Sequence, residues 1–231
     1  MIGILGVVIS LVKFKIKFKT PSIEEIKIKL KYGWNIFQSM IAINIYTTSN
    51  TFILGLFASE TVVGYFAAAN KIRMAFQGIQ SVLSQTAFPY VNSLAKESYE
   101  KFILFIKRLL KLEFAIGFSI SIMLFIISYQ LTDLLLGEKF VQSGELLRII
   151  SVLPLLGSLN NVFGIQIMLP LGYDKAFNKI ISFSALLHII LLIILVPEYF
   201  AIGAAVSAVI TEFIVTLFII WFVKKNKIAN G

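Results

Sequence analysis

Long apolar segments dominate this chain and leave few folds open to it. A helix needs about 17–25 mostly apolar residues to cross a bilayer. Six segments are long enough, at residues 33–57, 62–92, 112–131, 148–171, 180–197 and 202–223. The second is longer than a span requires, so we expect it to be tilted or to extend past the interface. Since 58% of the residues are hydrophobic and only 14% are charged, a soluble domain is excluded. We expect an all-α, polytopic membrane helix bundle with about six full transmembrane helices plus an N-terminal partial helix.

The N-terminus does not resemble a signal peptide. Residues 1–12 are apolar, and four lysines follow at positions 13, 15, 17 and 19, whereas a signal peptide carries its positive charge before the apolar core. We interpret residues 1–12 as the remnant of a transmembrane helix and expect the chain to be the C-terminal part of a longer protein. The rest divides into a basic connector at 13–32, a six-helix lobe at 33–223 and a tail at 224–231.

Lysine and arginine predict the orientation in the membrane. Segments 13–31, 94–111, 172–179 and 224–231 hold 7, 5, 2 and 3 of them, whereas the alternate loops hold only Lys139. Because cytoplasmic loops carry the excess of basic residues, these four segments and the C-terminus are predicted to be cytoplasmic.

Two segments outside the spans have distinct patterns. Residues 22–32 alternate Ile or Leu with Lys, which fits either a short amphipathic helix on the anionic leaflet or a solvated connector. Residues 132–145 predict a short interfacial helix and a turn, with Gly137 as the helix breaker.

The second span carries a polar stripe with two cations. Its members lie three or four residues apart and therefore share one helix face. They are Asn70, Arg73, Gln77, Gln80 and Ser84. A buried charge is costly in a bilayer, so it usually faces a cavity or a partner. We therefore expect Arg73 to line a polar cavity, with Lys71 only at the edge of the stripe. The alternative is that one cation pairs with an acid elsewhere in the bundle.

The first span carries a second polar face. It contains Asn35, Gln38, Ser39, Tyr46, Ser49 and Asn50. Hydrogen bonding between helices explains any one of these residues, but a stripe of this width indicates a cavity wall. Asn160, Asn161 and Gln166 make the fourth span polar on part of its surface.

Two ionisable residues in the later spans are candidates for ion coupling. Glu212 is an acid deep in the last span, suited to carry a proton, coordinate sodium or neutralise a cation such as Arg73. His188, the sole histidine, is either a proton switch or a packed, hydrogen-bonded residue. Cysteine is absent, and neither a catalytic triad, a metal-ligand spacing nor a phosphate loop occurs. We expect no enzyme activity, no metal and no cofactor.

Four stretches in order resemble the polysaccharide flippases. GWNIFQSMIAINIYTTSNTFILGLF and VVGYFAAANKIRMAFQGIQSVLSQTAFPYVNSLA resemble the seventh and eighth helices of Wzx-type O-antigen flippases, which belong to the multidrug/oligosaccharidyl-lipid/polysaccharide exporter superfamily. LLLGEKFVQSGELLRIISVLPLLGSLNNVFGIQIMLPLGYDKAF and VPEYFAIGAAVSAVITEF resemble its later helices. Family members often carry an acid where this chain has Asn50, so only hydrogen bonding is expected there.

The resemblance implies the second lobe of a two-lobe flippase in the bacterial inner membrane. The full protein would move a polyprenyl-diphosphate-linked oligosaccharide between leaflets by alternating access. Expected partners are that substrate, membrane lipid, the missing N-terminal lobe and, as a candidate, the polysaccharide polymerase machinery; nucleic acid is not expected. The expected cavity residues are Arg73, Lys71, Asn70, Gln77, Gln80, Asn50 and Gln38. The alternatives are a cation-coupled multidrug exporter of the same superfamily, a membrane enzyme of polysaccharide assembly, and a non-transporting remnant.

Overall fold

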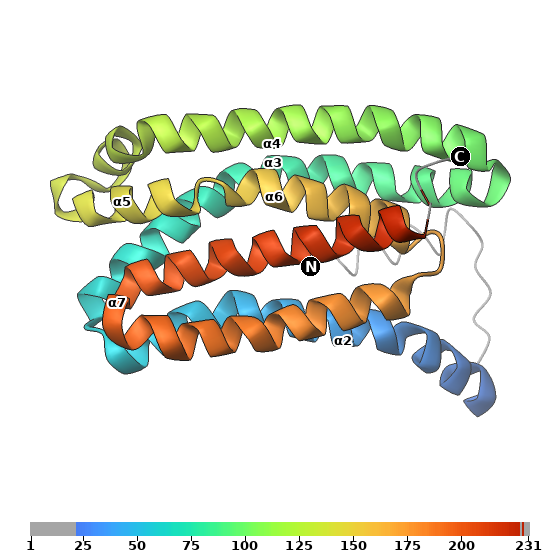
Figure 1. Ribbon diagram of the computed structural model, residues 1–231, viewed down its shortest axis with the longest axis horizontal. Helices are drawn as coiled ribbons and strands as arrows, with labels where there is room; N and C mark the ends of the chain where they lie inside the picture. The colour runs from blue at the N-terminus through green and yellow to red at the C-terminus, as the bar shows by residue number, and fades with distance from the viewer. Residues whose placement is uncertain (1–21, 227, 229–231) are drawn as a thin grey trace, which may run out of the picture. The chain divides into compact units, whose positions relative to one another are not determined.

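The computed structural model describes residues 22–226 and 228. The predictions for residues 1–12 and for the side chains of Asn35, Ser39 and Tyr46 lie outside the residues and side chains that it describes. Within the described part there are six α-helices, a short 3-10 helix and a π-helical segment (Figure 1). They are α2 (Ile23–Phe57), α3 (Glu60–Glu97), α4 (Tyr99–Leu136), η1 (Glu138–Phe140), α5 (Val141–Ile150), α6 (Leu153–Asn160), η2 (Asn161–Met168) and α7 (Asp174–Lys225).

Residues up to Asn35 and residues from Ile36 onward form two separate units. In the first unit, Ser22 caps α2. The Glu25 amide donates to Ser22 Oγ at 3.2 Å, and the Ser22 amide donates to Glu25 Oε2 at 3.0 Å. This reciprocal capping box satisfies two backbone donors at the helix start. The predicted connector is therefore helical from Ile23 onward and continuous with the first span, because no helix breaker separates them.

In the second unit the helices run back and forth between two ends (Figure 1). The turns at Ser59, at Gly137 and at Phe200 lie at one end, and the turns at Ser98 and Gly172 lie at the other. The second end carries the predicted cytoplasmic segments 94–111, 172–179 and 224–226. The helix arrangement therefore gathers the basic loops on one side, as the positive-inside rule requires.

Helix α7 contains 52 residues and folds back on itself at Phe200. A straight helix of this length would extend about 78 Å, far more than the bilayer core of about 30 Å. Pro197 lies inside the helix, and Phe200 adopts a positive φ of 46°. The two legs, 174–199 and 201–225, lie side by side in Figure 1. They correspond to the fifth and sixth predicted spans.

The fourth predicted span is a broken helix instead of a continuous one. Gly137 ends α4 with a φ of 82°, as predicted, and the chain returns through η1, α5 and α6. Pro154 lies at the start of α6, where its missing amide hydrogen costs little. Eight residues near the end of this span, Asn161–Met168, form the π-helical segment η2.

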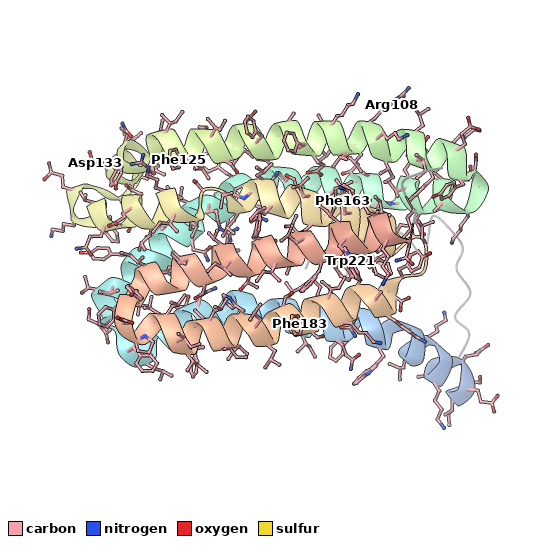
Figure 2. All side chains as sticks on the ribbon, in the orientation of Figure 1. Arg108, Phe125, Asp133, Phe163, Phe183 and Trp221 are labelled. Atoms are coloured by element: carbon pink, nitrogen blue, oxygen red, sulfur yellow. The ribbon has the colours of Figure 1, made fainter. Side chains whose placement is uncertain are left out.

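Large apolar side chains lie on the surface as well as in the core. Phe125, Phe183 and Trp221 are all about half exposed, and their side chains are labelled in Figure 2. Within the described part, three helical stretches are long and apolar enough to cross a membrane, at Tyr99–Leu136, Glu138–Met168 and Asp174–Lys225. An apolar exterior of this kind is suited to lipid.

Candidate functional site

Arg73 is fixed within the polar stripe by its neighbours on α3. Its Nε and Nη2 atoms donate to Asn70 Oδ1 at 3.0 and 2.9 Å, and Nη1 donates to Gln77 Oε1. All three residues are partly buried. One turn on each side thus holds the guanidinium group in a defined orientation, which limits the side-chain entropy lost on binding a ligand.

The next part of the stripe packs against α6. Gln80 is only 5% exposed, and its Nε2 donates to Ser158 Oγ and, at 3.3 Å, to Pro154 O. On α4, a methyl group added at Gly117 would meet both Gln80 Nε2 and Ser158 Oγ. Gln80 therefore takes part in a helix–helix contact, and its predicted role in substrate binding stays a prediction.

The stripe ends in a hydrogen-bonded group at the π-helical segment. Ser84 Oγ donates to Asn161 Oδ1 at 2.7 Å. Gln166 Nε2 donates to Ser84 O at 2.9 Å and to Ser84 Oγ at 3.1 Å. Gln166 is fully buried, so α3 and η2 are joined through polar contacts inside the bundle.

Lys71 does not share the environment of Arg73. Its side chain is exposed and borders an apolar pocket of about 350 Å³, together with Ile72, Phe76, Leu135 and Phe140 among others. The two cations are two residues apart and thus about 200° apart around the helix. The structure therefore separates them, as the spacing predicts.

The two candidates on α2 have different surroundings. Asn50 is buried at the level of Ile53 and Leu54, which pack into the core. Gln38 is exposed, and its Oε1 accepts a hydrogen bond from Asn178 Nδ2 of α7 at 3.0 Å. Their part in a common site with Arg73 stays a prediction.

The two ion-coupling candidates both contact other helices. Asn160 Nδ2 donates to Glu212 Oε1 at 2.7 Å, which links α6 to the second leg of α7. His188 has no exposed surface, and its Nδ1 lies 2.9 Å from Thr211 Oγ1. Thr211 in turn donates to Ser207 O at 2.8 Å. The histidine is thus packed and hydrogen-bonded, and its role in ion coupling stays a prediction.

Sequence reasoning missed Glu113, which is 1% exposed in α4. It comes two residues after Lys111, at the boundary between a predicted cytoplasmic segment and the third predicted span. One signal in the sequence could have indicated its burial. Glu113 lies four residues before Gly117 and eight before Ser121, so it shares a helix face with small residues that allow close packing. Among the described residues, no group of three or more His, Asp or Glu side chains is arranged to hold a metal ion.

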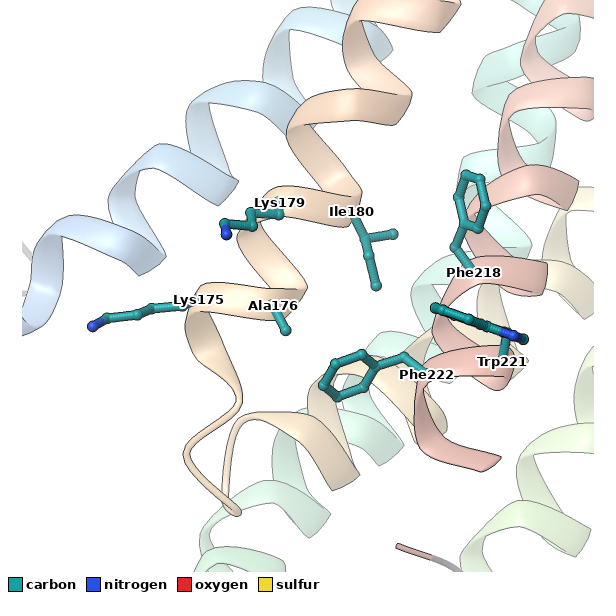
Figure 3. Close-up of a pocket in the computed structure, with 7 residues that line it drawn as sticks. All are labelled: Lys175, Ala176, Lys179, Ile180, Phe218, Trp221 and Phe222. Carbon is teal, nitrogen blue, oxygen red and sulfur yellow. The ribbon is translucent and has the colours of Figure 1, made fainter. Parts of the chain in front are cut away.

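A second pocket of about 460 Å³ lies between the legs of α7, near their ends (Figure 3). Ala176 and Ile180 form one wall, and Phe218, Trp221 and Phe222 form the other. Its lining shares no residue with the polar stripe of α3, so the pocket is separate from the candidate cavity site.

A membrane-embedded polar stripe on an all-α, lipid-compatible scaffold is typical of a transport protein. Residues 1–95 match the family model described as "Polysaccharide biosynthesis protein". The N-terminal part of the chain is therefore similar to that family.

The more specific relatives carry the name "Putative O-antigen transporter". The one from Escherichia coli (strain K12) is 36% identical over 209 residues, 90% of this chain and 50% of that protein. The one from Shigella dysenteriae is 31% identical over 203 residues, 87% of this chain and 50% of that protein. An uncharacterized membrane protein of Methanocaldococcus jannaschii is 24% identical over 139 residues, 60% of this chain and 27% of that protein.

These matches confirm the family resemblance indicated by the sequence. The chain spans about half the length of the two O-antigen relatives. No solved structure matches it.

Proposed function

We propose that this chain is one lobe of a flippase that moves a polyprenyl-diphosphate-linked oligosaccharide across the bacterial inner membrane. The observation that carries the proposal is the 36% identity over 209 residues to a protein described as an O-antigen transporter. The membrane-compatible helices and the absence of a catalytic constellation from the sequence favour transport over chemistry.

Arg73 is the residue best suited to the diphosphate. A guanidinium group has five N–H donors in a planar fork, which matches two phosphate oxygens at once. In this structure Asn70 and Gln77 accept three of its hydrogen bonds. A diphosphate would compete for these donors with a full negative charge, and the released amides would then be available to sugar hydroxyl groups.

Alternating access would move the oligosaccharide while its isoprenoid tail stays in lipid. The apolar exterior permits this division, because the tail needs no polar path. The cavity would lie between this lobe and a second lobe, with the C-terminus and basic loops in the cytoplasm. Glu212 and His188 are the candidates for ion coupling, and the polymerase machinery is a candidate partner.

Two alternative functions would require different residues or longer loops. A multidrug exporter for cationic drugs would favour acidic and aromatic cavity residues, whereas the stripe on α3 carries Arg73. A membrane enzyme of polysaccharide assembly would need reactive groups on large external loops, whereas the turns at Ser59, Gly137 and Phe200 are short.

Complementation of a flippase-deficient strain by the full-length protein tests the proposal. We expect surface polysaccharide to be restored by wild type, to be lost with Arg73→Ala and to stay low with Arg73→Lys, because lysine offers no bidentate fork. Arg108→Ala, at an exposed arginine of α4 outside the polar stripe, is the matched control and should retain most export. Equal surface polysaccharide from wild type and Arg73→Ala, at equal protein levels, would remove Arg73 from the site. Failure of wild type to complement, with drug resistance gained instead, would favour the exporter.

A further inference from the structure

The pocket between the two legs of α7 lies close to the residues where this helix begins and ends. Its volume of about 460 Å³ falls within the range of about 300–1,000 Å³ that is usual for ligand pockets. Ala176 and Ile180 of the first leg face Phe218 and Phe222 of the second (Figure 3). Because these walls are apolar, the pocket is suited to a hydrocarbon chain.

Aromatic contacts join the two legs on both sides of the pocket. Nearer the helix ends, the rings of Tyr173 and Phe222 pack edge to face, with 5.4 Å between their centroids. Farther from the ends, the rings of Phe183 and Phe218 pack edge to face at 5.9 Å. Another helix is about 10 Å across and cannot pass between legs that touch at both levels. A single acyl chain is much thinner, so it fits this space.

Lysines surround the mouth of the pocket. Lys175 and Lys179 are exposed and line its edge, and Figure 3 shows their ammonium groups directed away from the aromatic wall. On the opposite wall, Lys225 Nζ lies 4.6 Å from the centroid of the Trp221 ring. Segments 172–179 and 224–226 hold four lysines and a single acid, Asp174. The mouth therefore favours an anionic group.

The order of these groups along α7 matches the layers of a membrane leaflet. Lys175 and Lys225 lie in the first and last turns of the helix, at the level of lipid headgroups. Trp221 lies one turn from the end and is about half exposed, as is common at the membrane interface. Phe218 lies deeper. The basic loops predict that this end is cytoplasmic, and the cytoplasmic leaflet is the one rich in anionic lipids.

We propose that this pocket binds an anionic phospholipid of the cytoplasmic leaflet. One acyl chain lies between the legs of α7, and the phosphate contacts Lys175, Lys179 and Lys225. A lipid held at one end of the bundle stays in one leaflet, so it is a resident ligand and not a cargo that crosses the membrane. Its binding would hold the ends of the two legs together, whichever substrate is exported.

Thermal unfolding of the full-length protein in detergent, titrated with lipid, tests this site without a transport assay. We expect phosphatidylglycerol to raise the midpoint by about 2–4 °C at about ten times its dissociation constant. Phosphatidylcholine has no net charge, so it should need a concentration about 10–100-fold higher for the same shift. Glycerol 3-phosphate, which carries the charge without the acyl chains, should give no shift.

Two variants separate the contribution of the lysines from that of the apolar walls. The triple variant Lys175→Ala/Lys179→Ala/Lys225→Ala should bind phosphatidylglycerol no better than phosphatidylcholine. Ile180→Trp places a large side chain in the pocket and should abolish the shift with both lipids, whatever its effect on the midpoint without lipid.

The matched control removes three exposed cations from α4 on the same predicted side, as Lys107→Ala/Arg108→Ala/Lys111→Ala, and should keep the preference for phosphatidylglycerol. The proposal is overturned if wild type responds equally to the two lipids, or if the triple variant in α7 keeps the preference. It is also overturned if a polyprenyl phosphate gives a larger shift that Ile180→Trp abolishes, since the pocket then holds the tail of the cargo. A negative result leaves the flippase proposal standing, because complementation decides that separately.

Discussion

His188 and Thr211 join the two legs of α7 through one buried contact of 2.9 Å between Nδ1 and Oγ1. The residues are 23 positions apart and meet only because the helix folds back at Phe200. The Thr211 hydroxyl donates its one hydrogen to Ser207 O, so its Oγ1 acts as the acceptor toward Nδ1 of the histidine ring. This contact holds together two legs whose other buried residues are mostly apolar or small.

Thr211→Val should therefore destabilise the protein by about 1–3 kcal/mol, because the imidazole loses a buried hydrogen-bond partner. Thermal unfolding in detergent measures the change. Thr216→Val is the matched control: its hydroxyl donates to Glu212 O of its own helix, so a smaller loss is expected. Equal losses in the two variants would show that the contact between the legs adds little.

Gly117→Ala should lower stability by about 1–3 kcal/mol, the usual cost of overpacking. The added methyl group would lie 3.0 Å from Gln80 Nε2 and from Pro154 O, and closer still to Ser158 Oγ. The control is Gly78→Ala on α3, where nothing lies within 4 Å of the new atom. This control should be neutral or stabilising by up to about 1 kcal/mol, since alanine favours a helix. A stable Gly117→Ala protein would contradict the close packing of α4 on α6.

Phe200→Gly should be neutral or stabilising, because glycine adopts a φ of 46° without the strain that a side chain imposes. Tyr199→Gly, one residue earlier and within the helical leg, should instead cost about 1 kcal/mol. Unfolding of both variants in parallel provides the comparison. If Phe200→Gly is the more damaging change, side-chain packing at the turn outweighs the backbone strain.

Single cysteines should report the orientation of the helices without background, since the chain has none of its own. A membrane-impermeant thiol reagent applied to spheroplasts should label Glu138→Cys, at the turn after α4, and should leave Lys96→Cys unlabelled. Permeabilisation should then expose Lys96→Cys. The reversed pattern would contradict the orientation derived from the basic loops.

Much of the helical layout follows from local sequence. The positions of the long helices, the turn at Gly137 and the separation of Lys71 from Arg73 depend on apolar length, on a positive φ and on helical spacing, which are local properties. Of the helices that hold the six predicted spans, α2 and α3 are not among the described stretches apolar enough to cross a membrane. The break of the fourth span into α5, α6 and η2 was not predictable in this way. A π-helical segment has no clear signature in the sequence. In this protein, η2 is hydrogen-bonded to Ser84 of α3, a contact that depends on tertiary structure.

The polar stripe shows where sequence and tertiary structure divide. Helical periodicity alone determines that Asn70, Arg73, Gln77, Gln80 and Ser84 share one face of α3. Only packing decides that Gln80 and Ser84 are buried against α6 and η2 while Arg73 is only partly buried. The burial of Glu113 is likewise tertiary, because close approach at Gly117 brings α6 over a face that the sequence places beside a basic loop. A helix determines which residues point the same way, but only its neighbours determine whether that direction leads to lipid, to water or to another helix.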